Sequence, residues 1–355
     1  MKLHVHGTAY EQGRQLGAAA ADLIRENVRQ ASALLPNVES GFDPGAYTAM
    51  TRRNEAWVAR VYPELLEELH GIAETSGLEY FDLLHLNLNT DVAYARAYSM
   101  VLNCTQVVAR GPATADGKTY LAKTRDLSRG PTRHVFLERE YDDGSSRLEI
   151  QIAGQLTLPL GINNYGVAVG TSGQWSSRVV VDLARGDQAW HIPNLQPVLR
   201  CARSADEALE IMRDQPRVAG MNMTVVDSGH AYALEITSDE VRVSEPSDGL
   251  LVRTNHYVSP ALEHLTPTPS ENQGTFDRYA RASELANAAH KSINMQTMWQ
   301  ILSDHVPPPK QSICRHAGAE NAGRTYAGMV FCPQDHAVWA TFGNPCDGVQ
   351  YKLAA

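Results

Sequence analysis

The sequence predicts an α+β fold in which a helical N-terminal part is followed by antiparallel sheets that are covered by helices. Two observations support this prediction. Helical periodicity dominates the residues before Ser99, and short strand-like runs bounded by Gly, Asp and Asn dominate those after it. The runs form clusters with hairpin signals between them, which argues against a doubly wound parallel sheet.

The N-terminal part carries helical patterns in three places. The stretch Tyr10–Arg29 has its apolar residues on one face, at three- and four-residue steps. Arg53–Thr75 is strongly amphipathic, and Pro63 within it is expected to bend the helix or divide it in two. A further helix of mixed face is expected over Tyr80–Tyr98.

Strands and helices alternate in the remainder. Ala115-Asp116-Gly117 and Asp142-Asp143-Gly144 are typical of hairpin turns, and the Ser204–Glu207 segment is a capping box. The candidate strands are Thr105–Ala109, Thr119–Lys123, His134–Tyr141, Arg147–Ala153, Gly166–Gly170, Arg178–Val181, Asn222–Val226, His230–Ile236, Glu240–Ser244, Leu250–Thr254, Ala327–Cys332 and Val338–Phe342. The candidate helices are Asn194–Cys201, Ser204–Arg213, Arg278–Ala289 and Met295–Ser303.

Composition and charge exclude several classes of protein. The 355 residues are 43% hydrophobic and 20% charged, which is typical of a globular chain with a large core. A net charge of −9 without a basic block disfavours nucleic acid and anionic membranes as partners. No run approaches about 18 apolar residues, so no membrane span is expected. Five scattered cysteines without a C-x-x-C pair, and no apolar leader, predict a cytoplasmic protein.

The sequence lacks the phosphate-binding loop, the dinucleotide fingerprint and the G-x-S-x-G nucleophile elbow, so no cofactor is expected. His4 and His6 would face the same side of a strand and could bind one metal ion. The other histidines are scattered without a second tight pair. The sequence therefore predicts no metal site, and a metal hydrolase built on His4 and His6 is kept as an alternative.

Cys104 lies where the helical part meets the strands, and its thiol has three interpretations. It is a buried core residue, a nucleophile activated by a histidine, or an N-terminal nucleophile released by cleavage between Asn103 and Cys104. In the third case the freed α-amino group, with an ordinary pKa of about 7.7–8, supplies a base near working pH. The chemistry of the residue alone leaves these interpretations open.

Several short segments follow Cys104 in a fixed order. They are Lys123-Thr124-Arg125-Asp126, Gly161-Ile162-Asn163-Asn164-Tyr165-Gly166, Arg253-Thr254-Asn255-His256-Tyr257, Gly323-Arg324-Thr325 and Gly343-Asn344-Pro345-Cys346. In this order and spacing the chain resembles the acyl-CoA:6-aminopenicillanate acyltransferase family of N-terminal-nucleophile (Ntn) cysteine hydrolases, which also includes β-alanyl-amine hydrolases. The opening Gly7-Thr8-Ala9-Tyr10-Glu11-Gln12-Gly13, with Gly17 after it, resembles the N-terminal signature of this family.

The resemblance implies a four-layer αββα Ntn sandwich with a helical N-terminal segment. The chain would cut itself at Asn103-Cys104, leaving residues 1–103 as a small chain packed on a catalytic part over 104–355 in the same compact domain. Cys104 would then form an acyl-enzyme from a small-molecule amide or thioester and pass the acyl group to water or an amine. The expected partner is this substrate, and a homo-oligomer is compatible with the resemblance.

The resemblance also implies roles for residues that match the family's motifs. Asp126 would position the catalytic centre, and Asn255 would donate to the oxyanion, an effect worth about 2.7–4 kcal/mol in a good example. Asn163 falls in the family's Gly-x-Asn-x-x-Gly turn, and Arg324 matches a late arginine near the site. We expect Asn163, His256 and Arg324 to contribute to substrate binding.

One departure from the family concerns Thr124-Arg125, which stands where an Asn-Trp-like pair is expected. Arg125 near the thiol would favour the thiolate or recognise an anionic substrate group. An unprocessed acyltransferase or cyclase is an alternative, in which Cys104 acts in the intact chain with His256 as its base. A catalytically silent binding protein on the same fold is another.

Overall fold

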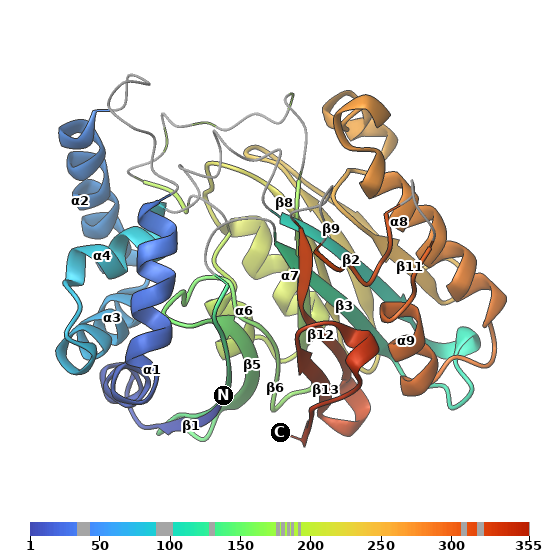
Figure 1. Cartoon of the computed structure of the whole chain (residues 1–355), viewed down its shortest axis with the longest axis horizontal. Helices are drawn as coiled ribbons and strands as arrows, with labels where there is room; N and C mark the ends of the chain where they lie inside the picture. The colour runs from blue at the N-terminus through green and yellow to red at the C-terminus, as the bar shows by residue number, and fades with distance from the viewer. Residues whose placement is uncertain are drawn as a thin grey trace.

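The computed structural model arranges the chain in four layers, with helices outside and two sheets between them (Figure 1). The structure describes residues 1–33, 43–89, 102–127, 132–174, 193–306, 311–317 and 323–354, together with 178, 182, 185 and 188–190. The predicted α+β class and the αββα arrangement are both confirmed. Within the described ranges, each helix is too short or too polar to cross a lipid bilayer.

The two sheets contain eight and six strands. In spatial order the first sheet consists of β1 (Lys2–His6), β4 (His134–Glu140), β5 (Ser146–Ile152), β6 (Leu160–Asn163), β7 (Ala168–Gly173), β8 (Met221–Val226), β9 (Ala231–Ile236) and β10 (Val241–Ser244). The second consists of β11 (Leu250–Arg253), β2 (Leu102–Ala109), β3 (Tyr120–Leu127), β12 (Arg324–Cys332), β13 (Ala337–Phe342) and β14 (Tyr351–Ala354). The β1–β4 pair is parallel, and the other described pairs are antiparallel.

Helices cover the outer face of each sheet. Against the first sheet lie α1 (Ala9–Ser32), α2 (Pro44–Val61), α3 (Pro63–Ser76), α4 (Tyr80–Leu84), the π-helical turn His85–Asn89, α6 (Gln196–Cys201) and α7 (Ala205–Asp214). Against the second lie α8 (Pro269–Ala288) and α9 (Met295–Leu302). Figure 1 shows α1 to α4 on one side of the sheets and α8 and α9 on the other.

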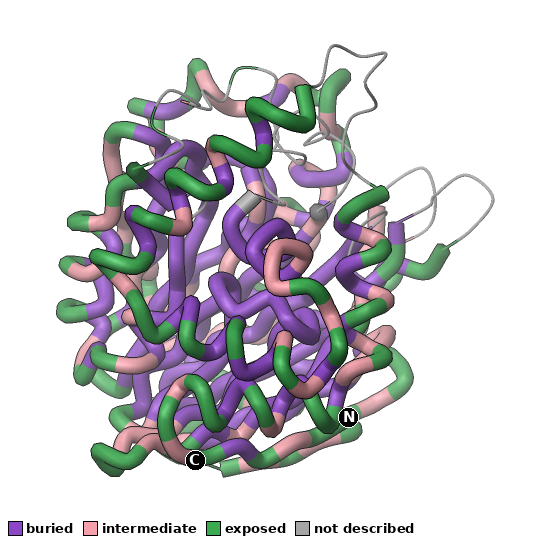
Figure 2. The backbone as a smooth tube through the Cα atoms, turned by 90° about the vertical axis from the view of Figure 1, so that its left-hand side faces the viewer, coloured by how far each residue is buried: buried purple, intermediate pink, exposed green. Residues whose placement is uncertain are grey.

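Hydrophobic side chains fill the spaces between the layers. Val108 and Leu121 belong to the core between the two sheets, together with Phe136 of β4. Their chain neighbours Val107 and Ala122 pack instead against α8 and α9, as expected from the alternation of side chains along a strand. Figure 2 shows the buried segments concentrated in the interior beneath helices with exposed outer surfaces.

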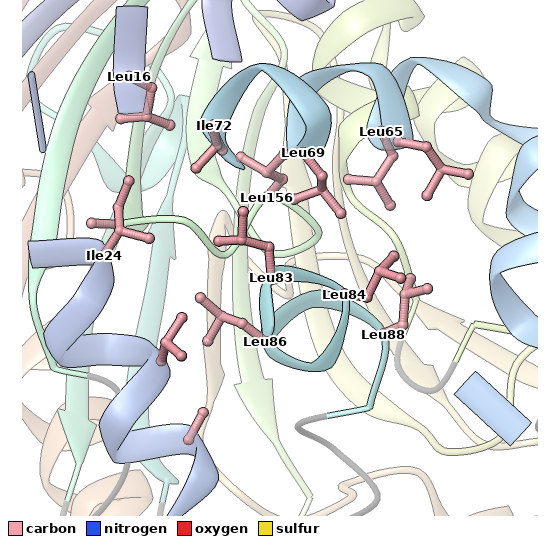
Figure 3. Packing of buried hydrophobic residues seen from close by; sticks show 14 of the residues in the cluster. Leu16, Ile24, Leu65, Leu69, Ile72, Leu83, Leu84, Leu86, Leu88 and Leu156 are labelled. Carbon is pink, nitrogen blue, oxygen red and sulfur yellow. The ribbon is translucent and has the colours of Figure 1, made fainter. Parts of the chain in front are cut away.

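The helical N-terminal segment has a leucine-rich core of its own. Leu16 and Ile24 of α1 meet Leu69 of α3 and Leu83 of α4, all with almost no exposed surface (Figure 3). Leu156, which follows β5, joins the same cluster and connects the segment to the first sheet. The apolar stripes visible in the sequence are therefore the faces that the helices bury.

The opening signature ties the first strand to the first helix. Thr8 is the N-cap of α1 and forms a capping box with Glu11. The Gln12 side chain donates to the carbonyls of Gly7 and Glu140, at 2.9 and 3.1 Å. These contacts give the signature residues a structural function.

A buried ion network fastens the same segment to the sheet. Arg139 of β4 contacts Glu68 of α3 at 2.8 Å and Glu149 of β5, and it donates to Gln12 of α1 at 2.9 Å. Glu149 also pairs with Arg147 at 2.8 Å. Opposite charges compensate one another here, so the loss of one partner would leave an unpaired buried charge.

The structure differs from the sequence prediction at several elements. Pro63 divides the second helical region as expected, whereas the third forms α4 and a π-helical turn, and residues beyond Asn89 on that side lie outside the described range. Most of the predicted strand Arg178–Val181 also lies outside it. Strands β6 and β14 were not predicted, because Gly161 breaks the first pattern and β14 is short. Helix α8 begins nine residues early, since its first turns are polar.

Candidate active site

The register of β2 and β3 sets the geometry around Cys104. Cys104 lies opposite Arg125, and Asn103 lies opposite Asp126. Because side chains alternate between the two faces of a strand, Cys104 and Arg125 point into the space between the sheets. Asn103 and Asp126 point toward α8. The Asn103–Cys104 peptide therefore lies between two different environments.

Asn255 holds the backbone of Cys104. It follows β11, the strand beside β2, and its side-chain oxygen accepts from the Cys104 N–H at 2.9 Å. Its own N–H donates to Thr275 Oγ1 of α8 at 2.8 Å, and its amide nitrogen donates to the Gly173 carbonyl at 2.8 Å. Asn255 is fully buried, and these bonds fix its orientation beside the thiol-bearing residue.

Arg278, which lies in α8, hydrogen-bonds to the same peptide. Its Nη1 donates to the Cys104 carbonyl, and its Nη2 donates to Asn103 Oδ1 at 3.0 Å and to Asn255 Oδ1 at 2.9 Å. Burial lowers the pKa of Arg278 to about 10, against the attraction of Asp126, so the group remains a cation at neutral pH. Arg278 and Asn255 together bracket the Asn103–Cys104 peptide.

Asp126 has a buried carboxyl group, and one of its two oxygens accepts a hydrogen bond. Thr325 of β12 donates to its Oδ1 at 2.7 Å, whereas its Oδ2 is buried without a hydrogen-bond partner among the described residues. Burial raises the pKa of Asp126, and the nearby guanidinium groups of Arg278 and Arg315 oppose that rise. The unused oxygen lies on the strand opposite Asn103.

Lys123 lies between the sheets on the same face as Cys104. Its ammonium group interacts electrostatically with the Cys104 thiol, and it donates to the carbonyls of Thr171 and Thr124. Burial is the main reason that the pKa of Lys123 is lowered, with the positive charge of Arg125 adding to the effect. A buried amine beside a thiol can stabilise a thiolate or exchange a proton with it.

Arg125 is buried on the same face as the thiol. His134 of β4 lies close enough to interact with the positive charge of Arg125. Burial, and after it this charge, lowers the pKa of His134 to about 3. Arg125 and Lys123 thus make the surroundings of Cys104 strongly cationic.

Two of the predicted substrate-binding residues are engaged elsewhere. The side chain of Asn163 closes the turn between β6 and β7, where it accepts from the Val167 N–H at 3.0 Å and donates to the Ala202 carbonyl at 2.7 Å. Arg324 is exposed at the start of β12, with its guanidinium 4.6 Å from the centre of the Tyr326 ring. These contacts do not bring either side chain to Cys104.

His256 packs against α8. Its Nδ1 lies 3.0 Å from Thr275 Oγ1, and its ring contacts those of Phe276 and Tyr279. Burial lowers the pKa of His256 to about 4, and Arg278 adds to this effect. Among the described residues the His256 ring contacts Thr254 and residues of α8, and its role as a base for Cys104 stays a prediction.

His4 and His6 do not form a metal site in the described residues. Both lie on the edge strand β1, their ring centres are 6.2 Å apart, and His4 approaches Glu140 at 3.5 Å. They belong to no cluster of three or more metal-ligating side chains among the described residues.

Sequence reasoning missed Lys123 and Arg278. Lys123 lies in a largely apolar predicted strand, two residues before Arg125. Residues two apart in a strand face the same side, so the sequence indicated that these two side chains share a face. Arg278 lies 174 residues after Cys104, and it was assigned only to a helix start. Only the packing of α8 on β2 brings it to the thiol-bearing residue.

The arrangement is suited to nucleophilic chemistry on a carbonyl carbon. It combines a buried thiol, a buried amine within hydrogen-bonding reach of it, and donors aimed at the neighbouring peptide. An amide donor fixed beside a nucleophile can stabilise an oxyanion.

Comparisons with known proteins agree with this chemistry. The sequence profile described as acyl-coenzyme A:6-aminopenicillanic acid acyl-transferase matches residues 113–347. The 40 kDa form of acyl-coenzyme A:6-aminopenicillanic-acid-acyltransferase from Emericella nidulans is 23% identical, with 97% of this chain and 93% of the relative covered. Two variants of conjugated bile acid hydrolase from Clostridium perfringens have TM-scores of 0.42 and 0.46 at 14% identity, covering 67% of this chain and 89% of theirs.

The profile match spans about two thirds of the chain, and it includes Asp126, Asn255 and Arg278. The relative from Emericella nidulans aligns over almost the whole length. The chain therefore belongs to the acyl-coenzyme A:6-aminopenicillanic acid acyl-transferase family.

Proposed function

We propose that Cys104 is the N-terminal nucleophile of this enzyme, set free by self-cleavage of the Asn103–Cys104 peptide. Family membership makes the protein an amidohydrolase or acyltransferase of the Ntn type. The proposal rests on the hydrogen bonds by which Arg278 and Asn255 hold that peptide. No other peptide next to a cysteine of the described chain has such an arrangement.

Self-cleavage needs one water molecule and no cofactor. The Cys104 thiol adds to the Asn103 carbonyl carbon, the C–N bond breaks, and a thioester with a free α-amine results. Water then hydrolyses the thioester, giving an Asn103 carboxylate and restoring the thiol. The thiol proton passes to the departing α-amine, and Arg278 fixes both residues that flank the bond.

Turnover then uses the new α-amine as a base. The amine takes the thiol proton, the thiolate attacks the substrate carbonyl, and the leaving group carries the proton away. Asn255 Oδ1 and the unused Asp126 Oδ2 are the acceptors available to orient the amine. The amide nitrogen of Asn255 carries two hydrogens and uses one on Gly173, so the second is available to an oxyanion.

The proposed substrate is a small-molecule amide or acyl thioester that carries an anionic group. The relative from Emericella nidulans is described as acting with acyl-coenzyme A and 6-aminopenicillanic acid. In this chain Arg125 and Lys123 line the space beside the thiol, and a guanidinium can bind a carboxylate in bidentate geometry. Arg125 is thus the residue expected to select an anionic substrate.

Trapping of the acyl-enzyme tests this function. Purified protein is mixed with acyl-coenzyme A or a penicillin, quenched in acid and analysed by mass spectrometry. We expect the acyl mass on the peptide that contains Cys104, and free coenzyme A or 6-aminopenicillanic acid in solution. Cys104→Ser should abolish thioester formation, whereas Cys201→Ser, which changes an exposed cysteine, should leave it intact. Equal labelling of both variants would contradict the assignment.

A second candidate is an intact-chain enzyme in which Lys123 is the base. It is favoured by the contact between Lys123 and Cys104 and by the burial that lowers the pKa of Lys123. In that case Cys104 remains internal, and Lys123→Met abolishes acylation while the chain shows one mass. Self-cleaved protein would exclude this candidate.

The cellular location of the enzyme and its oligomeric state belong to the same proposal. The five cysteines are free of disulfides, which favours the reducing cytoplasm. A homo-oligomer remains a prediction, and light scattering of the purified protein would measure the mass of the assembly.

A further inference from the structure

Four metal-ligating side chains from the chain around α9 and β13 converge on one point. His305 follows α9, Cys314 and His316 lie in the segment 311–317, and Cys346 lies in the 3₁₀ turn after β13. Their ligand atoms, two ring nitrogens and two sulfurs, all lie within 4.8 Å of one another. Three separate segments of chain thus place their side chains around one point.

Four of the six separations between these atoms are close to the edges of a metal-centred tetrahedron. The two sulfurs are 3.7 Å apart, the two Nε2 atoms are 3.1 Å apart, and His316 Nε2 lies 3.4 Å from Cys346 Sγ and 3.8 Å from Cys314 Sγ. Zn–S bonds of about 2.3 Å and Zn–N bonds of about 2.0–2.1 Å give tetrahedral edges of about 3.8 Å for S–S, 3.3 Å for N–N and 3.6 Å for S–N.

Neighbouring groups hold the ligands in place. Asn344 Nδ2 donates to Cys314 Sγ at 3.3 Å and to the Arg315 carbonyl at 2.7 Å. The Cys314 N–H donates to the Asp304 carbonyl at 3.1 Å, and Asp304 is itself paired with Arg281 of α8 at 2.7 Å. Such supporting hydrogen bonds orient the ligands of metal sites.

We propose that His305, Cys314, His316 and Cys346 bind one Zn²⁺ ion in a closed, structural Cys₂His₂ site. Tetrahedral S₂N₂ sets favour zinc among the common metals, and a site with four protein ligands leaves no position for substrate. Both thiols lose their protons to solvent when the ion binds. This inference reverses the sequence expectation of no metal site, and the Cys314-Arg315-His316 spacing was the signal available in the sequence.

The site stabilises a segment that supports the catalytic centre. Arg315 lies between two of the ligands, its N–H donates to Thr325 Oγ1 at 2.9 Å, and its carbonyl accepts from the Thr325 N–H at 2.9 Å. Thr325 in turn donates to Asp126. Zinc therefore fixes Arg315 and Thr325, which set the position of Asp126, and it takes no part in the reaction.

Metal analysis of the wild-type protein tests the proposal without relying on a variant. Untagged protein purified in reducing buffer is dialysed against metal-free buffer and analysed by inductively coupled plasma mass spectrometry. We expect about one zinc per chain. Replacement by Co²⁺ should give the intense visible bands of a tetrahedral site and a thiolate charge-transfer band. Absence of zinc both before and after incubation with ZnCl₂, or weak octahedral cobalt bands, would overturn the proposal.

Variants assign the ligands. Cys314→Ser combined with Cys346→Ser, and His305→Ala combined with His316→Ala, should each lower the zinc content at least about tenfold. The controls Cys201→Ser and His264→Ala change exposed residues elsewhere and should retain it. Full zinc content in either double variant would place the ion elsewhere. A Cys314–Cys346 disulfide in the reduced preparation would also overturn the proposal.

The zinc test is independent of the proposed function. Cys104→Ala should retain about one zinc per chain, because Cys104 is not a ligand. Zinc content and acyl-enzyme formation are therefore measured separately, and failure of one leaves the other standing.

Discussion

Lys123 and Arg278 give the surroundings of Cys104 their chemical character. Both are buried cations, one on each face of the β2–β3 pair. Lys123 interacts electrostatically with the thiol, whereas Arg278 hydrogen-bonds to the backbone carbonyl of the same residue. Because the two residues lie on opposite faces of the β2–β3 pair, they have different roles. Substitutions at the two positions should therefore have different consequences.

Lys123→Met should slow alkylation of the Cys104 thiol by iodoacetamide at pH 7.5 at least about tenfold, because the ammonium group no longer stabilises the thiolate. The measurement is the rate at which the peptide containing Cys104 is modified, read by mass spectrometry. Exposed Cys201 in the same sample serves as an internal control and should react unchanged. An unaltered rate at Cys104 would exclude the proposed contact.

Arg278→Met should slow self-cleavage by about 10²–10³, the loss typical of removing a fixed donor from a reacting peptide. The time course of the two fragments after synthesis of the chain provides the rate. Arg213→Met changes an exposed arginine of α7 that pairs with Glu210, and it should leave the rate within a few fold of normal. Equal rates in the two variants would remove Arg278 from the cleavage site.

The close contact between α1 and α3 depends on glycine. A Cβ atom at Gly71 would lie 2.2 Å from the Tyr10 carbonyl oxygen, and one at Gly13 would lie 2.1 Å from that of Glu68. These approaches place two backbones in direct contact. The glycines Gly13 and Gly17 of the N-terminal signature are thus explained by packing.

Gly71→Ala should lower the free energy of unfolding by about 1–3 kcal/mol, because overpacking outweighs the gain in helix propensity. Denaturant unfolding followed by circular dichroism measures this change. Gly45→Ala is a suitable control, since its added Cβ would meet a side-chain oxygen of Asp43 at 3.2 Å and no backbone atom. A stability of Gly71→Ala equal to wild type would show that the helices can separate.

The sequence predicts most elements and three of the central residues. Cys104, Asp126 and Asn255 were singled out because each lies in a short segment whose order along the chain resembles the family, and their catalytic roles stay predictions. Arg278 and the cluster around Cys314 were missed, because their contacts join residues far apart in sequence. Such contacts depend on how α8 and the last turns pack on the second sheet, which periodicity does not encode.

At the scale of the whole molecule, the buried network of Arg139 and Glu149 joins the N-terminal segment to the sheet. We therefore expect the two fragments of the cleaved protein to co-elute in native size-exclusion chromatography. Glu149→Gln should lower the free energy of unfolding by about 3–5 kcal/mol, since it removes the acidic partner of buried Arg147 and leaves Arg139 with Glu68 alone. Glu67→Gln, at an exposed position of α3, should have little effect. Separate elution of the wild-type fragments would contradict this account.

Two buried histidines predict how stability depends on pH. The pKa of His134 is lowered to about 3 and that of His256 to about 4, chiefly by burial. Below pH 6.5 the unfolded chain binds protons at these positions and the folded chain does not, so the free energy of unfolding falls as the pH falls toward 4. Each histidine contributes about 1.4 kcal/mol per pH unit in this range.

A chain with both His134→Gln and His256→Gln should show a shallower decline of Tm between pH 6.5 and 4.5. His264→Gln, an exposed control, should retain the wild-type slope. Thermal unfolding at a series of pH values provides the comparison. A slope unchanged by the double substitution would assign the acid sensitivity to other groups.

The central claim is that Cys104 becomes an N-terminal residue. A denaturing intact-mass spectrum of freshly purified protein tests it most directly, with Cys104→Ala as the control. Scaling the 38.9 kDa chain by length predicts fragments of about 11 and 28 kDa from the wild type and a single full-length species from the variant. A wild-type spectrum that contains only the full-length chain, in a preparation that forms the acyl-enzyme, would contradict the claim and favour the intact-chain mechanism through Lys123.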